Sequence, residues 1–290
     1  MFKILPCRKF LGSKEVYEKA KIILVSFPLD HTVTFRSGTR FAPSAIRDAS
    51  YSLEEYSLLT ERNILDIPFY DWGELELPQG DLSTSLKLIE AASETIIGDS
   101  KSPAVIGGEH LITYPVIKAL KNKFDNLVVF DLDAHFDLRD SYYGIKYSHA
   151  TVMRRIAEVI GVENLFQFGI RSGTKEEKDF SAGSNLHTLS SKSLEEALLK
   201  SCDRPIYLTV DIDVLDPAFA PGVGTPEPGG TSSREILDFL SFLQNGNIVG
   251  FDLVEVCPPY DPSSITATLG AKLILEILFL IGKNMMDKNP

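Results

Sequence analysis

Short runs of apolar, largely β-branched residues recur along the chain and constrain its fold more than any other feature. The clear runs occupy residues 21–27, 103–106, 127–130, 165–170, 206–210 and 248–251, and weaker candidates occupy 64–70 and 186–189. Each run has the length of a β-strand and is almost continuously apolar. This pattern is typical of parallel strands that are covered on both faces.

Helical patterns lie between these runs. Apolar residues recur at helical spacing over 82–97, 114–120, 151–160, 194–199, 234–243 and 266–281, and Pro43 can begin a further helix that runs through Ile46. Alternation of strands and helices predicts an α/β fold with a central, mostly parallel sheet of about eight strands. Because no repeat or low-complexity linker divides the 290 residues, we expect a single domain spanning 1–290.

The net charge and the cysteines limit the possible partners and the compartment. A formal charge of −11 disfavours nucleic acid and fits a metal ion or a small cationic substrate, although solubility alone commonly explains such acidity. Cys7, Cys202 and Cys257 form no CxxC pair, so we expect no disulfide framework and a reducing, cytoplasmic location. The apolar run 273–281 contains Glu276 and is too short to span a bilayer, which predicts a buried closing helix and no membrane partner.

Polar side chains follow several of the predicted strands, where ligands of open α/β sheets bind. The run 103–106 leads into Gly107, Gly108, Glu109 and His110. Taken alone, His110 is more often structural than a metal ligand. The run 127–130 leads into an acidic segment, 131–137, that places Asp133, His135 and Asp137 at a strand end; a solvated acidic loop is the alternative.

A second acidic segment makes a metal site the better interpretation. Asp211 and Asp213 follow the run 206–210 and project to one side of an extended segment. The candidate ligands are His110, Asp133, His135, Asp137, Asp211 and Asp213. Oxygen ligands with a few imidazoles favour Mn²⁺ or Mg²⁺, and six side chains predict a site for two ions. Glu255 follows the run 248–251, where a surface or salt-bridged acid is an equally good interpretation.

Four segments of the sequence resemble the ureohydrolase family of arginases and agmatinases. They are 107–110, 133–137, the long stretch 211–222 (DIDVLDPAFAPG) and 252–255. The resemblance extends from about residue 36 to the final helix, and the 211–222 stretch is highly specific. It implies an α/β/α sandwich and two Mn²⁺ ions per subunit. It also implies that relatives form trimers or hexamers, so a homo-oligomer is expected.

The resemblance also assigns the ligands residue by residue. His110, Asp133, Asp137 and Asp211 resemble the ligands of one ion; Asp133, His135, Asp211 and Asp213 resemble those of the other, so Asp133 and Asp211 would bridge. Glu109, Leu111 and Val223 depart from the commoner Asp, Ser and Thr. None of the three is a ligand position, but Val223 puts a substrate contact of the 222–226 loop in doubt.

Within the family, the chain is more similar to agmatinases than to arginases. The segment 216–221 is agmatinase-like, and Leu138, Arg139 and Asp140 stand where arginases carry an Asn soon after the ligand Asp. The implied reaction converts agmatine and water to putrescine and urea, with a hydroxide bridging the two ions as nucleophile. A carboxylate suits the planar guanidinium, so Glu255 is expected to bind it.

Further roles follow from the same resemblance. Asp137 would orient the nucleophile, Thr225 would contact substrate, and His149 would bind substrate and carry protons, because the unperturbed pKa of histidine lies near neutrality. The alternative for His149 is a loop histidine that only orders its neighbours. For Arg139, a salt bridge to a nearby acid is the better interpretation than a contact with a cationic tail.

Two other functions remain open. One is a sibling ureohydrolase acting on arginine, guanidinobutyrate, formimidoylglutamate or another guanidino compound. The other is a catalytically silent relative that only binds partners or stores metal. The intact ligand set, together with Glu255 and His149, argues against the silent relative.

Overall fold

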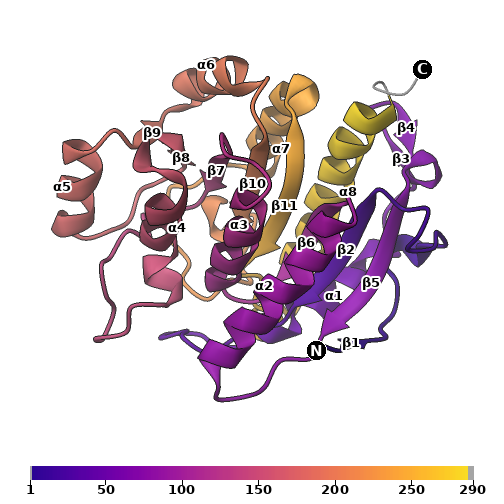
Figure 1. Ribbon diagram of the computed structural model, residues 1–290, viewed down its shortest axis with the longest axis horizontal. Helices are drawn as coiled ribbons and strands as arrows, with labels where there is room; N and C mark the ends of the chain where they lie inside the picture. The colour runs from indigo at the N-terminus through magenta and orange to yellow at the C-terminus, as the bar shows by residue number, and fades with distance from the viewer. Residues whose placement is uncertain (1, 287–290) are drawn as a thin grey trace.

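A nine-stranded sheet runs through the centre of the molecule, whose computed structural model describes residues 2–286 (Figure 1). Its strands, in order across the sheet, are β1 (Ile4–Leu5), β5 (Phe69–Leu75), β2 (Ile22–Phe27), β6 (Ser102–Gly107), β11 (Ile248–Val254), β10 (Ile206–Asp211), β7 (Val128–Leu132), β8 (Leu165–Phe168) and β9 (His187–Leu189). Within this sheet the described strand pairs are parallel, except that β1 pairs antiparallel with β5. The predicted mostly parallel α/β fold is confirmed, with nine strands in the sheet rather than eight.

Helices cover both faces of the sheet and make three layers (Figure 1). One face packs against α1 (Ala42–Ser50), α6 (Ser191–Ser201), α7 (Ser233–Phe242) and α8 (Ile265–Met286). The other packs against α2 (Leu82–Gly98), α3 (Thr113–Lys121) and α4 (Val152–Ile160). Successive strand residues serve opposite layers: Leu24 packs with the first set and Val25 with the second. This double coverage explains the nearly continuous apolar runs.

The elements that the sequence did not reveal are short or polar. β1, β3 (Tyr56–Ser57) and β4 (Arg62–Asn63) have two residues each, too few for a periodic signal. Helix α5 (Lys175–Gly183) is mostly polar, and only its capping box, in which Thr174 and Glu177 bond each other's backbone amides, marks its start.

One predicted strand is displaced along the chain. The expected strand 64–70 is observed as β5, Phe69–Leu75. Residues Ile64–Asp66 instead form a 3₁₀ turn, in which the side chain of Asn63 accepts a hydrogen bond from the amide of Leu65. Pro68 follows this turn, and the strand begins immediately after it.

The closing helix α8 is the one helix in the described part of the chain that is long and apolar enough to cross a membrane. Its window Ile265–Gly282 has a mean hydropathy of 1.9, and 78% of that window is buried inside the protein. The prediction of a buried closing helix is confirmed. Glu276, which interrupts the apolar run, is itself buried and accepts a hydrogen bond from Ser57.

The order of the central strands positions the site. β6, β11, β10 and β7 are adjacent and parallel, with Ile106 beside Leu253 and Val210 beside Leu132. Their carboxyl ends therefore meet at the same edge of the sheet, and the four segments singled out in the sequence follow these four strands.

Candidate metal centre and active site

The six predicted ligands converge at the carboxyl edge of the central strands. Asp211 is the last residue of β10, and Asp133 follows the last residue of β7. His110 is the first residue of the short 3₁₀ turn His110–Ile112, and Asp213 lies in the short 3₁₀ turn Ile212–Val214. The turn at Asp213 is fixed locally, because the Asp211 carboxylate accepts a hydrogen bond of 2.8 Å from the amide of Asp213.

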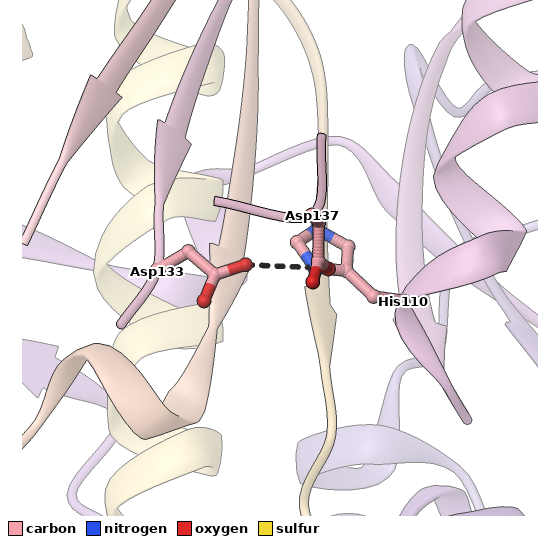
Figure 2. Close-up of side chains that lie close together, drawn as sticks. All are labelled: His110, Asp133 and Asp137. Atoms are coloured by element: carbon pink, nitrogen blue, oxygen red, sulfur yellow. Dashed lines mark ion pairs between the residues drawn. The ribbon is translucent and has the colours of Figure 1, made fainter. Parts of the chain in front are cut away.

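Two groups of side chains in this cluster are close enough to hold a metal ion. The first contains His110, Asp133 and Asp137; the second contains Asp133, His135 and Asp213. Figure 2 shows the first group, in which His110 Nδ1 lies 3.2 Å from Asp133 Oδ2 and 3.5 Å from Asp137 Oδ2. In the second group, His135 Nδ1 lies 3.0 Å from Asp213 Oδ2. Asp133 is shared, as the predicted bridging role requires.

Asp211 lies beside the first group. Its Oδ2 atom is 3.5 Å from His110 Nδ1, and its side chain is almost fully buried. Its position is compatible with the predicted ligand role, whereas its predicted bridging of two ions stays a prediction.

A buried hydrogen-bond network fixes the orientation of His110. The hydroxyl of Thr209 donates to the Asp252 carboxylate at 2.6 Å, so it accepts a hydrogen bond from His110 Nε2 at 2.9 Å. Tyr207 and Thr113 also donate to Asp252. These donor and acceptor roles place the proton of a neutral His110 on Nε2. The lone pair of Nδ1 then faces the carboxylates, as metal coordination requires.

The chemistry of the cluster fits divalent cations. His110 Nδ1 and Asp133 Oδ2 are buried without a hydrogen-bond partner, which is costly for groups that no ion satisfies. Burial and the neighbouring carboxylates of Asp213 and Asp133 raise the pKa of Asp211. Burial and Asp133 likewise raise the pKa of Asp137 to about 7. A cation would replace this mutual repulsion with attraction.

A cavity opens beside the cluster, and Glu255 faces it. The cavity is lined by residues of both groups and by Glu255, His149, Thr225, Arg139 and Tyr142. Glu255 is 7% exposed, and its Oε1 accepts a hydrogen bond of 2.7 Å from the amide of His110. Burial raises its pKa, although this hydrogen bond opposes the shift. Asp137 and Glu255 both adopt positive φ angles, 50° and 65°, which are strained for such residues and common at functional sites.

His149 begins the 3₁₀ turn His149–Thr151 that leads into α4. Its ring meets the ring of Tyr142 edge-on at 5.6 Å. Burial, with the positive charges that His135 and His110 would carry, lowers the pKa of His149 to about 4, so its imidazole is neutral near pH 7.

Three further sequence predictions have clear structural outcomes. Thr225 lines the cavity and its hydroxyl donates to Asp213 Oδ2 at 3.3 Å. Val223 is buried and pairs with Val256, so it belongs to the core rather than to the cavity lining. Arg139 lies 3.8 Å from Glu177, which confirms the expected pairing with a nearby acid, but it also lines the cavity.

The sequence did not reveal two residues, Glu109 and Thr32, that are linked by hydrogen bonds to His149. In the sequence, Glu109 is marked only by its departure from a commoner Asp, and Thr32 carries no signal. Glu109 is fully buried and bonds Thr32, which in turn bonds His149. Burial raises the pKa of Glu109 to about 7, although hydrogen bonds from Thr32 and His31 oppose the shift.

Comparison with known proteins gives consistent matches over most of the chain. The model of the arginase family matches residues 20–280. An agmatinase of Bacillus subtilis is 44% identical over 274 residues, which cover 93% of this chain and 94% of the relative. A guanidinobutyrase of Pseudomonas aeruginosa is 34% identical, with 89% and 85% covered. The solved structure of the agmatine ureohydrolase of Thermoplasma volcanium superposes with a TM-score of 0.86 at 32% identity, covering 98% of this chain and 97% of that one.

Proposed function

Because this chain belongs to the arginase family, we propose that it is an agmatinase, which hydrolyses agmatine to putrescine and urea. The observation that carries the proposal is the joint presence of two ligand groups sharing Asp133 and of a buried carboxylate, Glu255, at one cavity. The identity of 41–44% to agmatinases from several bacilli supports agmatine over other guanidino compounds.

The proposed cofactors are two Mn²⁺ ions. His110, Asp133, Asp137 and Asp211 would hold one, and Asp133, His135, Asp211 and Asp213 the other. When bound, the ions would lower the pKa of a water molecule and so supply a nucleophile near neutral pH. Oxygen-rich ligands with two imidazoles suit Mn²⁺, and the described part of the cluster contains no thiolate.

Glu255 is the group that we assign to the guanidinium. A carboxylate can accept two parallel N–H bonds from this planar cation. Glu255 Oε1 accepts a hydrogen bond from the amide of His110, whereas Oε2 lies near Gly224. The carboxylate is thus held by the backbone beside a metal ligand, so the substrate carbon would be placed close to the nucleophile.

Asp137 and His149 are assigned to the proton transfers. Asp137, a member of the first ligand group, lines the cavity and would accept a hydrogen bond from the attacking water. His149 lines the same cavity, so its imidazole would take up a proton and give it to the departing amine. The products are then urea and a protonated diamine.

A substrate panel tests the proposal. The purified protein, loaded with Mn²⁺, is assayed for urea with agmatine, arginine and guanidinobutyrate, and for formamide with formimidoylglutamate. We expect the highest kcat/KM with agmatine and loss of activity after chelation, with recovery when Mn²⁺ is restored. Turnover of another compound at a higher kcat/KM would reject agmatine as the substrate, and no turnover of any compound would indicate a silent relative.

One observation favours a second candidate, a guanidino acid such as guanidinobutyrate. Arg139 lines the cavity and would attract a carboxylate at the end of the substrate, and a guanidinobutyrase is among the relatives. Glu177, 3.8 Å away, offsets this charge, so agmatine remains the preferred proposal.

We also propose a homo-oligomer, a trimer or hexamer, which light scattering of the purified protein would measure directly.

A further inference from the structure

The loop after β2 lies against the loop after β6 and carries Thr32 to His149, which lines the cavity. Gly108 permits this approach, because a Cβ atom at this position would lie 2.0 Å from the carbonyl oxygen of Leu29. The amide of Gly108 donates to Phe27, and the amide of Glu109 donates to Leu29. The side chain of Glu109 is thereby placed beneath this loop and is completely buried.

The Glu109 carboxylate accepts three hydrogen bonds from the loop. Its Oε2 atom accepts the amides of His31 at 2.9 Å and Thr32 at 2.7 Å. Its Oε1 atom accepts the hydroxyl of Thr32 at 3.0 Å. All three of these contacts are donated to the carboxylate, and such hydrogen bonds favour its ionised form.

The Thr32 hydroxyl has only one hydrogen, and its contacts determine where that hydrogen points. The amide of His149 can only donate, and it donates to Thr32 Oγ1 at 3.0 Å. The remaining contact, at 3.1 Å, joins Thr32 Oγ1 to His149 Nδ1. Because the hydroxyl hydrogen goes to the carboxylate, His149 Nδ1 must be the donor in this contact.

We propose that Glu109 and Thr32 are positioning residues that hold His149 as the Nδ1–H tautomer and leave Nε2 as the nitrogen that exchanges the proton with the reacting groups. The inference rests on the proposed function for the role of His149, but the tautomer itself does not depend on which substrate is cleaved. A fixed tautomer keeps the basic nitrogen toward the reaction, as the aspartate does for histidine in serine proteases.

Glu109→Gln reverses the direction of the hydrogen bonds that run from residue 109 through Thr32 to His149. It does so without changing the shape of the side chain at position 109. The amides of residues 31 and 32 require an acceptor, so the Gln carbonyl oxygen takes the place of Oε2. The Gln amide group then faces Thr32 Oγ1 and donates to it. The Thr32 hydroxyl hydrogen turns toward His149 Nδ1, and the histidine proton moves to Nε2. Thr32→Val removes the hydroxyl that links Glu109 to His149, whereas Thr32→Ser keeps it.

Steady-state agmatine hydrolysis by the Mn²⁺-loaded protein measures the consequence. We expect Glu109→Gln and Thr32→Val to lower kcat by about 10- to 100-fold, with KM and bound metal nearly unchanged, and Thr32→Ser to stay within about threefold of the parent. The exposed residues Glu94 and Thr95 on α2 provide matched controls, Glu94→Gln and Thr95→Val, which should leave kcat unchanged. Parental kcat in both Glu109→Gln and Thr32→Val overturns the proposal.

A double-mutant cycle separates action through His149 from damage to the neighbouring ligand His110. In a His149→Phe background, Glu109→Gln and Thr32→Val should lower the residual kcat by less than about twofold. If each still costs tenfold in that background, the two residues act elsewhere and the proposal is wrong.

The tautomer of His149 can be measured by a method that does not depend on catalytic activity. Histidine ¹⁵N NMR spectra of the full-length protein at pH 9, with diamagnetic Mg²⁺ and with His149→Phe to assign the signal, should place the proton on Nδ1 in the parent and on Nε2 in Glu109→Gln. A parental proton on Nε2 overturns the inference. Absence of urea release by the parent would instead reject the proposed function, and the NMR result would still decide the tautomer.

Discussion

His110 and His149 each bond a threonine hydroxyl, but the two hydroxyls orient their rings differently. Thr209 gives its hydrogen to Asp252 and receives the Nε2 proton of His110. Thr32 gives its hydrogen to Glu109 and, in our proposal, receives the Nδ1 proton of His149. In both cases a buried carboxylate that contacts neither histidine directly sets the direction of the bond. The first histidine thereby presents Nδ1 to a metal ion, and the second presents Nε2 to a reacting proton.

Thr209→Val removes the acceptor for His110 while it keeps the volume of the side chain. We expect the affinity for Mn²⁺ to fall about 10- to 100-fold, as is usual when the partner of a metal-bound histidine is lost. Calorimetric titration of the metal-free protein with Mn²⁺ measures this change, and Thr209→Ser should bind nearly as the parent does. Equal affinities in Thr209→Val and the parent would show that this hydrogen bond does not orient the ligand.

His149→Phe removes the proposed proton carrier. We expect kcat for agmatine to fall about 10²- to 10⁴-fold, because general acid–base catalysis contributes factors of this size. Bound Mn²⁺, measured by mass spectrometry, should stay at the parental level, since His149 belongs to neither ligand group. An unchanged turnover rate with an unchanged pH profile would remove His149 from the mechanism.

At the scale of elements, a buried ion pair joins three parts of the fold that the sequence did not connect. Arg47 on α1 makes two bonds of 2.8 Å to the Asp71 carboxylate on β5 and donates to Ser26 on β2. Asp71 also accepts the amide of Phe10 from the N-terminal segment. Both members of the pair are at most 1% exposed, so neither charge can turn to water if its partner is removed.

Arg47→Met therefore leaves an unpaired buried carboxylate. We expect a loss of about 3–5 kcal/mol in the free energy of unfolding, measured by guanidinium titration. The exposed pair of Arg8 with Asp48, the latter also on α1, is the control: Arg8→Ala should leave the free energy of unfolding nearly unchanged. Similar small losses in both variants would show that Asp71 is satisfied by its amide partners alone.

At the scale of the whole molecule, part of the acidic surplus belongs to the site. Asp133, Asp137, Asp211 and Asp213 are proposed ligands, and two divalent ions would bring the formal charge from −11 to −7. Carboxylates that repel one another in a buried cluster favour unfolding when no cation is bound. Metal binding should accordingly stabilise the native state, because the unfolded chain cannot present these ligands together.

Removal of metal should lower the melting temperature. If free Mn²⁺ is present at 100 times its Kd, binding adds about 2.7 kcal/mol, and for a protein of this size that corresponds to roughly 4–5 °C. Scanning calorimetry with Mn²⁺ and with a chelator measures the shift, and Asp133→Ala, which disrupts both groups, should abolish it. An Mn²⁺-dependent shift that persists in Asp133→Ala would place the stabilising ion elsewhere.

The sequence by itself determined the fold class and the residues of the candidate site. Both produce local sequence patterns, because an apolar strand and the polar residues that follow it lie within about ten positions of each other. In a parallel sheet the carboxyl ends of strands share one edge, so segments as distant as 107–110 and 211–213 could be expected to meet. Periodicity failed where elements were too short or too polar, as at β1 and α5.

Only the tertiary structure decided how these residues work together. Side-chain alternation places Asp131 and Asp133 on the same side of an extended segment. In the structure, however, Asp131 accepts a hydrogen bond from Gln167, while Asp133 belongs to both ligand groups. The bonds between Thr32 and His149 cross 117 residues of sequence, and no local pattern encodes them. The physical reason is that hydrogen-bond direction depends on every partner of a group at once, and those partners come from separate strands, loops and helices that only folding brings together.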